Sequence, residues 1–321
     1  MKTLRWATRL IIVALLIGLV SIFPGRGLAA YPEKGLTLIV AYGAGGGTDT
    51  TARLLAADLS EVLGQSVTVR NVTGGGGWNG WGTIAGSRPD GYTIGYINIP
   101  NMFAGYLDKR IGRPESLNSF TTITNHVTDP CIWAVKADSP FKSVNDLITY
   151  AKANPGELSI TAHGNGSDDH VAILSMQEIT GIGFKIIHNT STAISKTQVL
   201  GGHVDVLGGN VSEVVALAKK GELRVLGVMS EQRSEFLPQV STFREQGFDS
   251  VWAVSRGIAA PAGLPADIRN KITTSLEKVL SSEEHRAKAA TLGLKIQIIT
   301  GDAYATFLKN MEQNVKKLMG W

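Results

Sequence analysis

Three glycine-rich turns contain the residues of this sequence whose types and spacing could bind an anion. They lie at residues 43–48, 74–77 and 164–167, each between an expected strand and an expected helix. A turn of this kind exposes unpaired backbone N–H groups at the positive end of the helix dipole, where an anion can be held. One such turn is weak evidence because turns need glycine anyway, but three at equivalent places favour a binding site.

The first turn differs from the known nucleotide-binding loops. Thr48 stands where a dinucleotide fingerprint needs its third glycine, and no Lys-Ser/Thr pair of a phosphate loop follows. His163 and His170, with Asp168 and Asp169 between them, could suggest a metal site. Two histidine ligands on one helix need i, i+4 spacing, which these residues lack, so a polar helix cap is the preferred interpretation. We therefore expect no nucleotide, metal or other cofactor.

The sequence also lacks the common catalytic motifs. The sequence contains no Gly-x-Ser-x-Gly and no His-Glu-x-x-His motif. Ser167 and His170 are close enough to suggest a nucleophile and a base, but no acid or oxyanion partner can be named, so ligand hydrogen bonds are favoured over catalysis. Cys131 is the single cysteine and is expected to be a small buried hydrophobe. Trp78 and Trp81 are expected in the core, with a wall for an apolar ligand as the alternative.

Alternating strands and helices must position these turns. Residues 36–41, 65–71 and 92–97 read as strands. Thr48 or Asp49 should cap a helix that ends near Leu63 and is stopped by Gly64, and Ser143 should cap a later helix. The pattern repeats beyond residue 130, with strands at 132–136, 158–162, 185–188, 204–207 and 225–229 and helices at 143–153, 169–180, 193–200 and 211–220. Helices are expected near 266–280, 283–292 and 302–317. The sequence thus predicts two α/β lobes with parallel sheets, and a C-terminal stretch with little sheet that packs on the first lobe.

The N-terminus reads as a secretory signal peptide. Lys2, Arg5 and Arg9 precede an apolar run at residues 10–20, and small residues lead to a cleavage site after Ala30. Residues 1–30 hold four of the 31 basic residues, so 27 remain against 27 acidic ones. The signal peptide predicts an exported protein, and the balanced charge predicts no nucleic-acid partner.

Ordered motifs across nearly the whole remaining chain resemble the substrate-binding proteins of tripartite tricarboxylate transporters, the Bug or TctC family. They are AYGAGGGTDxxARLL at 41–55, LGQxVxVxN at 63–71, PDGYT at 89–93, GxGSxxH at 164–170, LGGHVD at 200–205, GxLRxLGV at 221–228 and APAGLP at 260–265.

The resemblance implies an α/β fold with two lobes, a type II periplasmic binding protein or Venus flytrap with its ligand cleft between the lobes. Lobe 1 would comprise residues 31–130 plus 254–321, and lobe 2 residues 131–253. It implies a non-enzymatic protein that captures a small carboxylate by lobe closure and delivers it to the large and small integral subunits of a membrane transporter. The implied ligand-binding residues are Tyr42, Gly43, Ala44, Gly45, Gly46, Thr48, Asp49, Gly75, Gly76, Gly77, Trp78, Asn79, Ser167, His170, Thr190, Ser191, Thr192 and Asn210.

Two departures from the family pattern leave the ligand open. The chain reads Ile187-His188-Asn189 where members often have Val-Pro-aromatic, and Trp78 follows the second glycine turn, where a small or polar residue is commoner. Both positions are expected to face the cleft. A di- or tricarboxylate, an aromatic acid and an amino acid all remain compatible. The alternatives for function are a ligand-sensing module for a membrane receptor and, less favoured, a hydrolase. A monomer is the default for this architecture.

Overall fold

The structure is a computed structural model that describes residues 31–321, of which residues 34–321 form one compact unit. The predicted signal peptide and its cleavage site after Ala30 lie outside the described residues. Within the described part of the chain, no helix has both the length and the apolar character needed to cross a bilayer.

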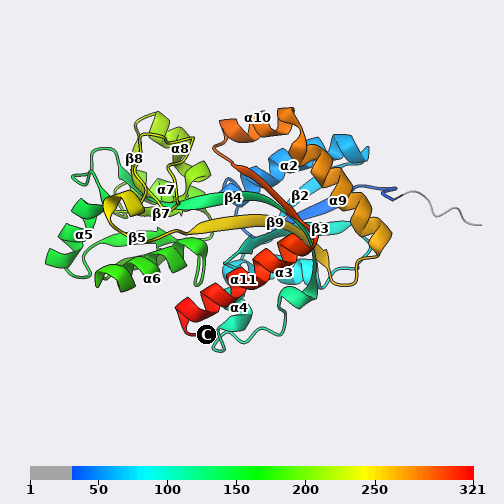
Figure 1. Cartoon of the computed structure of the whole chain (residues 1–321), viewed down its shortest axis with the longest axis horizontal. Coiled ribbons are helices and arrows are strands. Elements are labelled where there is room, and N and C mark those ends of the chain that lie inside the picture. The colour runs from blue at the N-terminus through cyan, green and yellow to red at the C-terminus, as the bar shows by residue number, and fades with distance from the viewer. Residues whose placement is uncertain (1–30) are drawn as a thin grey trace, which may run out of the picture. The chain divides into compact units, whose positions relative to one another are not determined.

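A mixed sheet organises one half of this unit (Figure 1). Its strand order is β10-β4-β9-β3-β1-β2. The strands are β1 (Leu36–Val40), β2 (Val67–Asn71), β3 (Thr93–Ile99), β4 (Phe120–Lys136), β9 (Ala253–Pro261) and β10 (Ile296–Thr300). β1 pairs in parallel with β2 and β3, whereas β9 pairs antiparallel with β3 and β4. In this sheet, parallel pairing as predicted is therefore present only among β1, β2 and β3.

Helices cover both faces of this sheet. α2 (Gly47–Leu63) packs against α9 (Ala266–Ser281) and α10 (Glu283–Thr291). The opposite face carries a second group of helices, which shares one apolar cluster with Ile39 and Ile97 of the sheet. These helices are α3 (Trp78–Ala85), α4 (Phe103–Leu107) and α11 (Gly301–Met319). Figure 1 shows α11 beside α3 and α4, away from α9 and α10.

The second half of β4 belongs to another sheet. Its residues from Cys131 onward pair with β7 (Leu207–Asn210) and β8 (Leu223–Val228). The parallel pair β5 (Ser159–Ala162) and β6 (Lys185–His188) joins β7 through a bridge between Ile160 and Val206. The helices around these strands are α5 (Val144–Ala153), α6 (Asp168–Thr180), α7 (Thr192–Leu200) and α8 (Val211–Lys219) (Figure 1). The fold thus has two α/β lobes with separate apolar clusters.

Local sequence signals explain several helix ends. Ser143 and Asp146 form a capping box at the start of α5, as the predicted N-cap at Ser143 requires. Gly64 ends α2 with φ 65°, a left-handed conformation that favours glycine. These signals lie within one turn of the helix end, which is why they are readable from the sequence.

The C-terminal stretch departs from its prediction. Instead of having little sheet, residues 253–300 contribute β9 and β10 to the first sheet. The local strand signal of β9 is weak, because Arg256 and Gly257 interrupt its apolar residues. Burial between β3 and β4 overrides this weak local preference. The predicted lobe boundaries at 130/131 and 253/254 lie within β4 and at the beginning of β9.

Candidate functional site

A small cavity lies where the two lobes meet. Tyr42 follows β1, Asn98 lies near the end of β3, His163 follows β5, and Asn210 ends β7. Ligands of open α/β folds bind at such carboxyl ends of strands. The lining residues are Tyr42, Gly46, Gly47, Thr48, Asn98, Asn101, His163, Asp168, Ser191, Thr192, Asn210, Glu213, Val254 and Arg256.

Four helices begin at this cavity. The N-caps of α2, α6, α7 and α8 are Gly46, Ser167, Ser191 and Asn210. Helix N-termini carry partial positive charge and unpaired N–H groups, so their convergence favours a negatively charged ligand. Acidic side chains in the first turns of α2, α6 and α8 already supply part of the negative charge that these N-termini favour.

The first glycine turn is largely occupied by bonds within the protein. The N–H of Gly43 donates to the Thr190 carbonyl at 3.2 Å, across the two lobes. The Gly45 N–H donates to Asp49 Oδ2 at 2.9 Å. The Gly47 N–H donates to Glu213 Oε1 of the other lobe at 3.1 Å. The predicted N-cap at Thr48 or Asp49 is wrong by two or three residues, because α2 begins at Gly47 with Gly46 as its N-cap.

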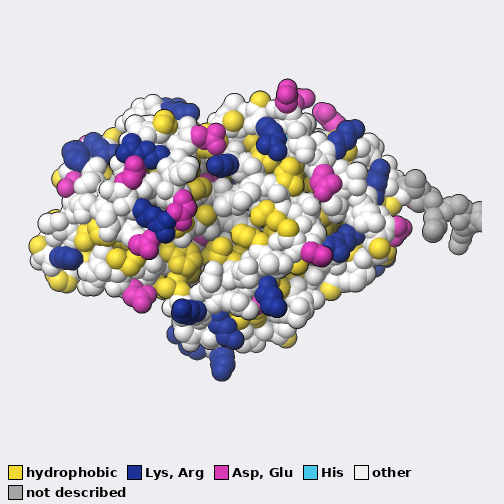
Figure 2. Space-filling view, in the orientation of Figure 1, with side chains coloured by type: hydrophobic (Ala, Val, Ile, Leu, Met, Phe, Trp, Pro, Cys, Tyr) yellow, Lys and Arg dark blue, Asp and Glu magenta, His cyan; other side chains and the backbone are white. Residues whose placement is uncertain are grey.

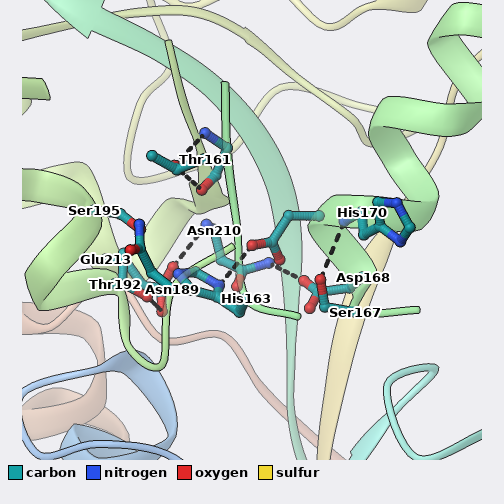
Figure 3. A network of polar contacts seen from close by, with 12 residues as sticks. Thr161, His163, Ser167, Asp168, His170, Asn189, Thr192, Ser195, Asn210 and Glu213 are labelled. Atoms are coloured by element: carbon teal, nitrogen blue, oxygen red, sulfur yellow. Dashed lines mark hydrogen bonds and ion pairs between the residues drawn. The ribbon is translucent and has the colours of Figure 1, made fainter. Parts of the chain in front are cut away.

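Glu213 connects three helix N-termini. Its Oε1 accepts a hydrogen bond from the Thr192 hydroxyl at 2.5 Å as well as the Gly47 bond, and its Oε2 accepts from the Asn210 N–H at 3.0 Å. Figure 3 shows Glu213 beside Thr192, with Asn210 between them and Asp168. Glu213 is not among the predicted site residues, although Asn210-x-x-Glu213 is a capping box that can be recognised from the sequence.

Arg256 of β9 is a buried cation in the cavity lining. Its Nη1 donates to Asp129 Oδ2 at 2.7 Å, and its Nη2 lies 3.9 Å from Glu213 Oε1. Burial raises the pKa of Asp129, although the nearby Arg256 acts to lower it. Arg256 is not among the predicted site residues either, because only the pairing of β9 with β4 brings it next to Asp129.

An acidic pair opens α6. His163 Nδ1 lies 2.5 Å from Asp169 Oδ2. Burial acts to lower the pKa of His163, but the adjacent Asp169 outweighs it and raises this pKa to about 9. Burial, followed by repulsion from Asp169, raises the pKa of the Asp168 carboxyl to about 7. Asp168 Oδ2 accepts from Asn210 Nδ2 at 2.8 Å (Figure 3).

Ser167 and His170 form a helix cap. The Ser167 hydroxyl oxygen accepts from the His170 backbone N–H at 3.2 Å, while His170 Nδ1 accepts from the Gly166 N–H at 2.9 Å (Figure 3). Burial lowers the pKa of His170 to about 4. The His170 ring therefore does not take a proton from Ser167 in this arrangement, and neither residue is among those that line the cavity.

Cys131 is buried, as predicted, and its thiol donates to Asp168 Oδ2 at 3.4 Å. Burial raises the pKa of this thiol, which keeps it protonated. Among the residues that the structure describes, no three His, Cys, Asp or Glu side chains are grouped so as to hold a metal ion.

The second glycine turn lies close to the third. A methyl group built on Gly164 would lie 3.4 Å from the Cα of Gly76. Trp78 is buried against Trp81 and Tyr106, and its indole N–H donates to the Met102 carbonyl at 3.2 Å. Trp78 is therefore a core residue of the first lobe and does not line the cavity. Ile187 and His188 are exposed, and they do not line it either.

The structure brings together about a third of the sequence-predicted site. The predicted residues that line the cavity are Tyr42, Gly46, Thr48, Ser191, Thr192 and Asn210. The others lie outside its lining: Gly43, Ala44, Gly45, Asp49, Gly75, Gly76, Gly77, Trp78, Asn79, Ser167, His170 and Thr190. Lining residues that the prediction omitted are Gly47, Asn98, Asn101, His163, Asp168, Glu213, Val254 and Arg256.

Comparison with known proteins links this geometry to a family. Residues 51–320 match the family model TctC, described as tripartite tricarboxylate transporter family receptor. A UPF0065 protein from the gbd 5' region of Cupriavidus necator is 30% identical over 293 residues, covering 90% of this chain and 88% of that protein.

Solved structures agree in fold. The periplasmic binding protein BugD is 27% identical with a TM-score of 0.85, over 90% of this chain and 98% of that one. An R. palustris protein solved with adipate is 26% identical with a TM-score of 0.83, over 90% of this chain and 98% of its own. The fold is thus that of a two-lobed, type II periplasmic binding protein.

Proposed function

The chain belongs to the TctC family of tripartite tricarboxylate transporter receptors, and from this premise we propose that it captures a small carboxylate between its lobes for a membrane transporter. The family consists of solute-binding proteins, and the chain is not an enzyme. One observation carries the proposal: four helix N-termini converge on one cavity at the meeting point of the lobes. The adipate bound to a relative of the same fold supports it.

Binding stabilises the closed arrangement through the ligand's higher affinity for it. Thr48 lies in the first turn of α2 and Thr192 in that of α7, on opposite sides of the cavity. A carboxylate held by both sides joins the lobes, and β4 and β9 act as the hinge because both run between them. Lobe 1 is taken as residues 31–130 plus 254–321 and lobe 2 as 131–253.

In this proposal, the predicted binding residues that do not line the cavity support the turns and helix N-termini that do. Gly43, Gly45 and Thr190 hold the first turn in place through the backbone bonds described above. Ser167 and His170 cap α6 and thereby orient the acidic pair at its start. The turn at residues 75–79 approaches the third glycine turn and closes the cleft beside the cavity.

The proposed setting is the periplasm, which the chain reaches by a signal peptide cleaved after Ala30. The relatives named above include a periplasmic binding protein, which supports this setting. The partners are the large and small integral subunits of a tripartite tricarboxylate-type transporter. The protein is proposed to act as a monomer.

A thermal-shift screen tests the binding role. Residues 31–321 are melted in the presence of mono-, di- and tricarboxylates, aliphatic and aromatic. A ligand at about 100 times its Kd adds about 2.7 kcal/mol to the free energy of unfolding, which gives a clear rise in Tm. Recovery of the ligand chemically unchanged is expected. No shift with any carboxylate, at concentrations up to the millimolar range, would contradict the proposal.

A further inference from the structure

The carboxylate of Glu213 occupies hydrogen-bond donors from both lobes at the cavity. Its Oε1 accepts from the Gly47 N–H of α2 at 3.1 Å and from the Thr192 hydroxyl of α7 at 2.5 Å, and its Oε2 accepts from the Asn210 N–H at 3.0 Å. Donors at helix N-termini are also the groups that hold the carboxylates of ligands. A carboxylate of the protein therefore fills the place at the start of α2 and α7 where the proposed function puts a carboxylate of the ligand.

Further donors lie beside this carboxylate. Arg256 Nη2 is 3.9 Å from Glu213 Oε1, which is too far for a hydrogen bond, and a methyl group built on Gly47 would lie 2.5 Å from that Nη2 and 2.7 Å from that Oε1. Among the side chains that the structure describes, Arg256 and His163 each keep one nitrogen without a hydrogen-bond partner, Nε and Nε2, although they are only 1% and 8% exposed. Buried polar atoms are normally paired, so the lining has the capacity to bind another group.

We propose that Glu213 is an internal competitor of the ligand: its carboxylate occupies the carboxylate site at the N-termini of α2 and α7, and the ligand must displace it to bind. This inference rests on the proposed function, because it takes a carboxylate as the ligand. Two carboxylates cannot share the Gly47 N–H and the Thr192 hydroxyl, since each of these groups has one hydrogen to donate. The measured affinity for a ligand is therefore lower than that of the vacated site, in proportion to the fraction of molecules in which Glu213 has left it.

Displacement needs only a side-chain movement. Glu213 is the third residue of α8, so a change of its rotamer moves the carboxylate away from Gly47 and Thr192 while the helix stays in place. Arg256 Nη2 is a cation within reach, and an ion pair with it compensates the charge of Glu213 once the other bonds are lost. Arg256 is itself held by Asp129, whose Oδ2 accepts from Nη1 at 2.7 Å. Glu213 thus has two alternative sets of partners, one of which leaves the helix N-termini to the ligand.

Replacement of Glu213 by Ala tests the inference with acetate as the probe. The substitution removes the side chain beyond Cβ, and the removed atoms have the size and charge of acetate. Calorimetry should show that acetate binds Glu213→Ala at least about tenfold more tightly than the wild type, as charge-assisted hydrogen bonds provide. Acetate should also restore Tm that the variant has lost, whereas acetamide, its neutral counterpart, should not. Glu222→Ala, at an exposed glutamate of the same lobe, is the control and should bind acetate no better than the wild type.

Glu213→Gln gives a second readout, with the carboxylate found in the thermal-shift screen. The amide keeps the shape of the native side chain but lacks its charge, so a ligand displaces it more easily. We expect this variant to bind the ligand about tenfold more tightly than the wild type does. A residue that only supported the site would change the affinity in the opposite direction. Glu213→Gln also decides the question if Glu213→Ala does not fold.

The outcomes separate this inference from the proposed function. If a carboxylate from the screen binds the wild type but neither variant gains affinity, Glu213 is not a competitor, and this inference is overturned while the proposed function stands. Weaker binding of that ligand by Glu213→Gln overturns it in the same way, because Glu213 then supports the bound ligand. If no carboxylate, acetate included, binds the wild type or either variant, the proposed function is overturned as well.

Discussion

At the scale of single residues, Glu213 ties the first turn of α2 to the lobe that carries α7 and α8. Its carboxylate meets the Gly47 N–H, the Thr192 hydroxyl and the Asn210 N–H, and its side chain is only 4% exposed. This arrangement places a protein carboxylate at the N-terminus of α2, where the sequence predicts a ligand carboxylate. Part of the predicted loop is therefore used to hold the lobes together.

Replacement of Glu213 by Ala should reduce the free energy of unfolding by about 1–3 kcal/mol, because buried donors lose their acceptor. Glu213→Gln should lose less, since its amide oxygen can still accept. Urea denaturation of both variants measures the effect. Glu222→Ala removes an exposed glutamate of the same lobe and should change little. Equal stability of Glu213→Ala and the wild type would show that these hydrogen bonds do not support the fold.

At the scale of elements, the turn before α2 tests whether the cavity binds the ligand. Gly46 has φ −80°, so a larger residue meets no backbone strain there. A methyl group at Gly46 would lie 3.3 Å from the Gly43 carbonyl oxygen and 3.7 Å from Ser191 Cβ of the other lobe. Gly76 is a poorer position for this test, because its φ of 64° penalises any other residue.

We expect Gly46→Val to weaken ligand binding at least about tenfold, or 1.4 kcal/mol, with a Tm close to that of the wild type. The valine branches enter the space between the α2 and α7 N-termini. Calorimetry with the ligand found in the screen measures the loss. Gly183→Val is the control, since a Cβ at Gly183 has no heavy atom within 4 Å. Unchanged affinity of Gly46→Val would remove this turn from the site.

The elements differ in how far the sequence predicts them. Helix ends with local signals, such as Ser143 before α5 and Gly64 after α2, were predicted because the signal lies within one turn. The contacts that Arg256 and Glu213 make across the cavity could not be predicted, because these partners lie 127 and 166 positions away in the chain; only the capping box of Glu213 with Asn210 is local. Which N–H groups remain free for a ligand depends on such tertiary contacts, and these are not encoded in any local pattern.

At the scale of the whole molecule, a buried row of hydrogen-bonded side chains makes the stability of the fold depend on pH. Figure 2 shows basic and acidic side chains interspersed over the lobe that carries α5 and α8. Inside the other lobe, the Tyr96 hydroxyl lies 2.7 Å from His126 Nδ1, His126 Nε2 lies 3.0 Å from His285 Nε2, and His285 Nδ1 lies 2.6 Å from Asp58 Oδ2. Asp58 accepts from His285, so His285 Nε2 is the acceptor and His126 Nε2 carries the proton.

Burial lowers the pKa of His126 well below its usual value. In the unfolded chain His126 takes up a proton near pH 6.5, whereas in the folded chain it stays neutral there. The free energy of unfolding therefore keeps its full value above pH 6.5 and falls as the pH decreases below it. The contribution is about 1.4 kcal/mol per pH unit for one histidine.

His126→Gln removes this titration. As the pH is lowered from 6.5 to 5, the free energy of unfolding should therefore fall less in the variant than in the wild type. Urea denaturation at each pH measures this difference. His203→Gln, at an exposed histidine, is the control. A constant difference across this range would show that His126 is not neutral in the folded protein.

The path of β4 also has a consequence for the order in which the chain is completed. The early half of β4 pairs with β9 and β10, which lie more than a hundred residues later, whereas its late half pairs with β7 and β8 before residue 230. When the chain is synthesised from its N-terminus, the sheet that contains β1, β2 and β3 can be completed only after β9 and β10 have been made. The sheet formed by β7, β8 and the late half of β4 can be completed earlier. The lobe whose strands are made first is therefore the last to complete its sheet.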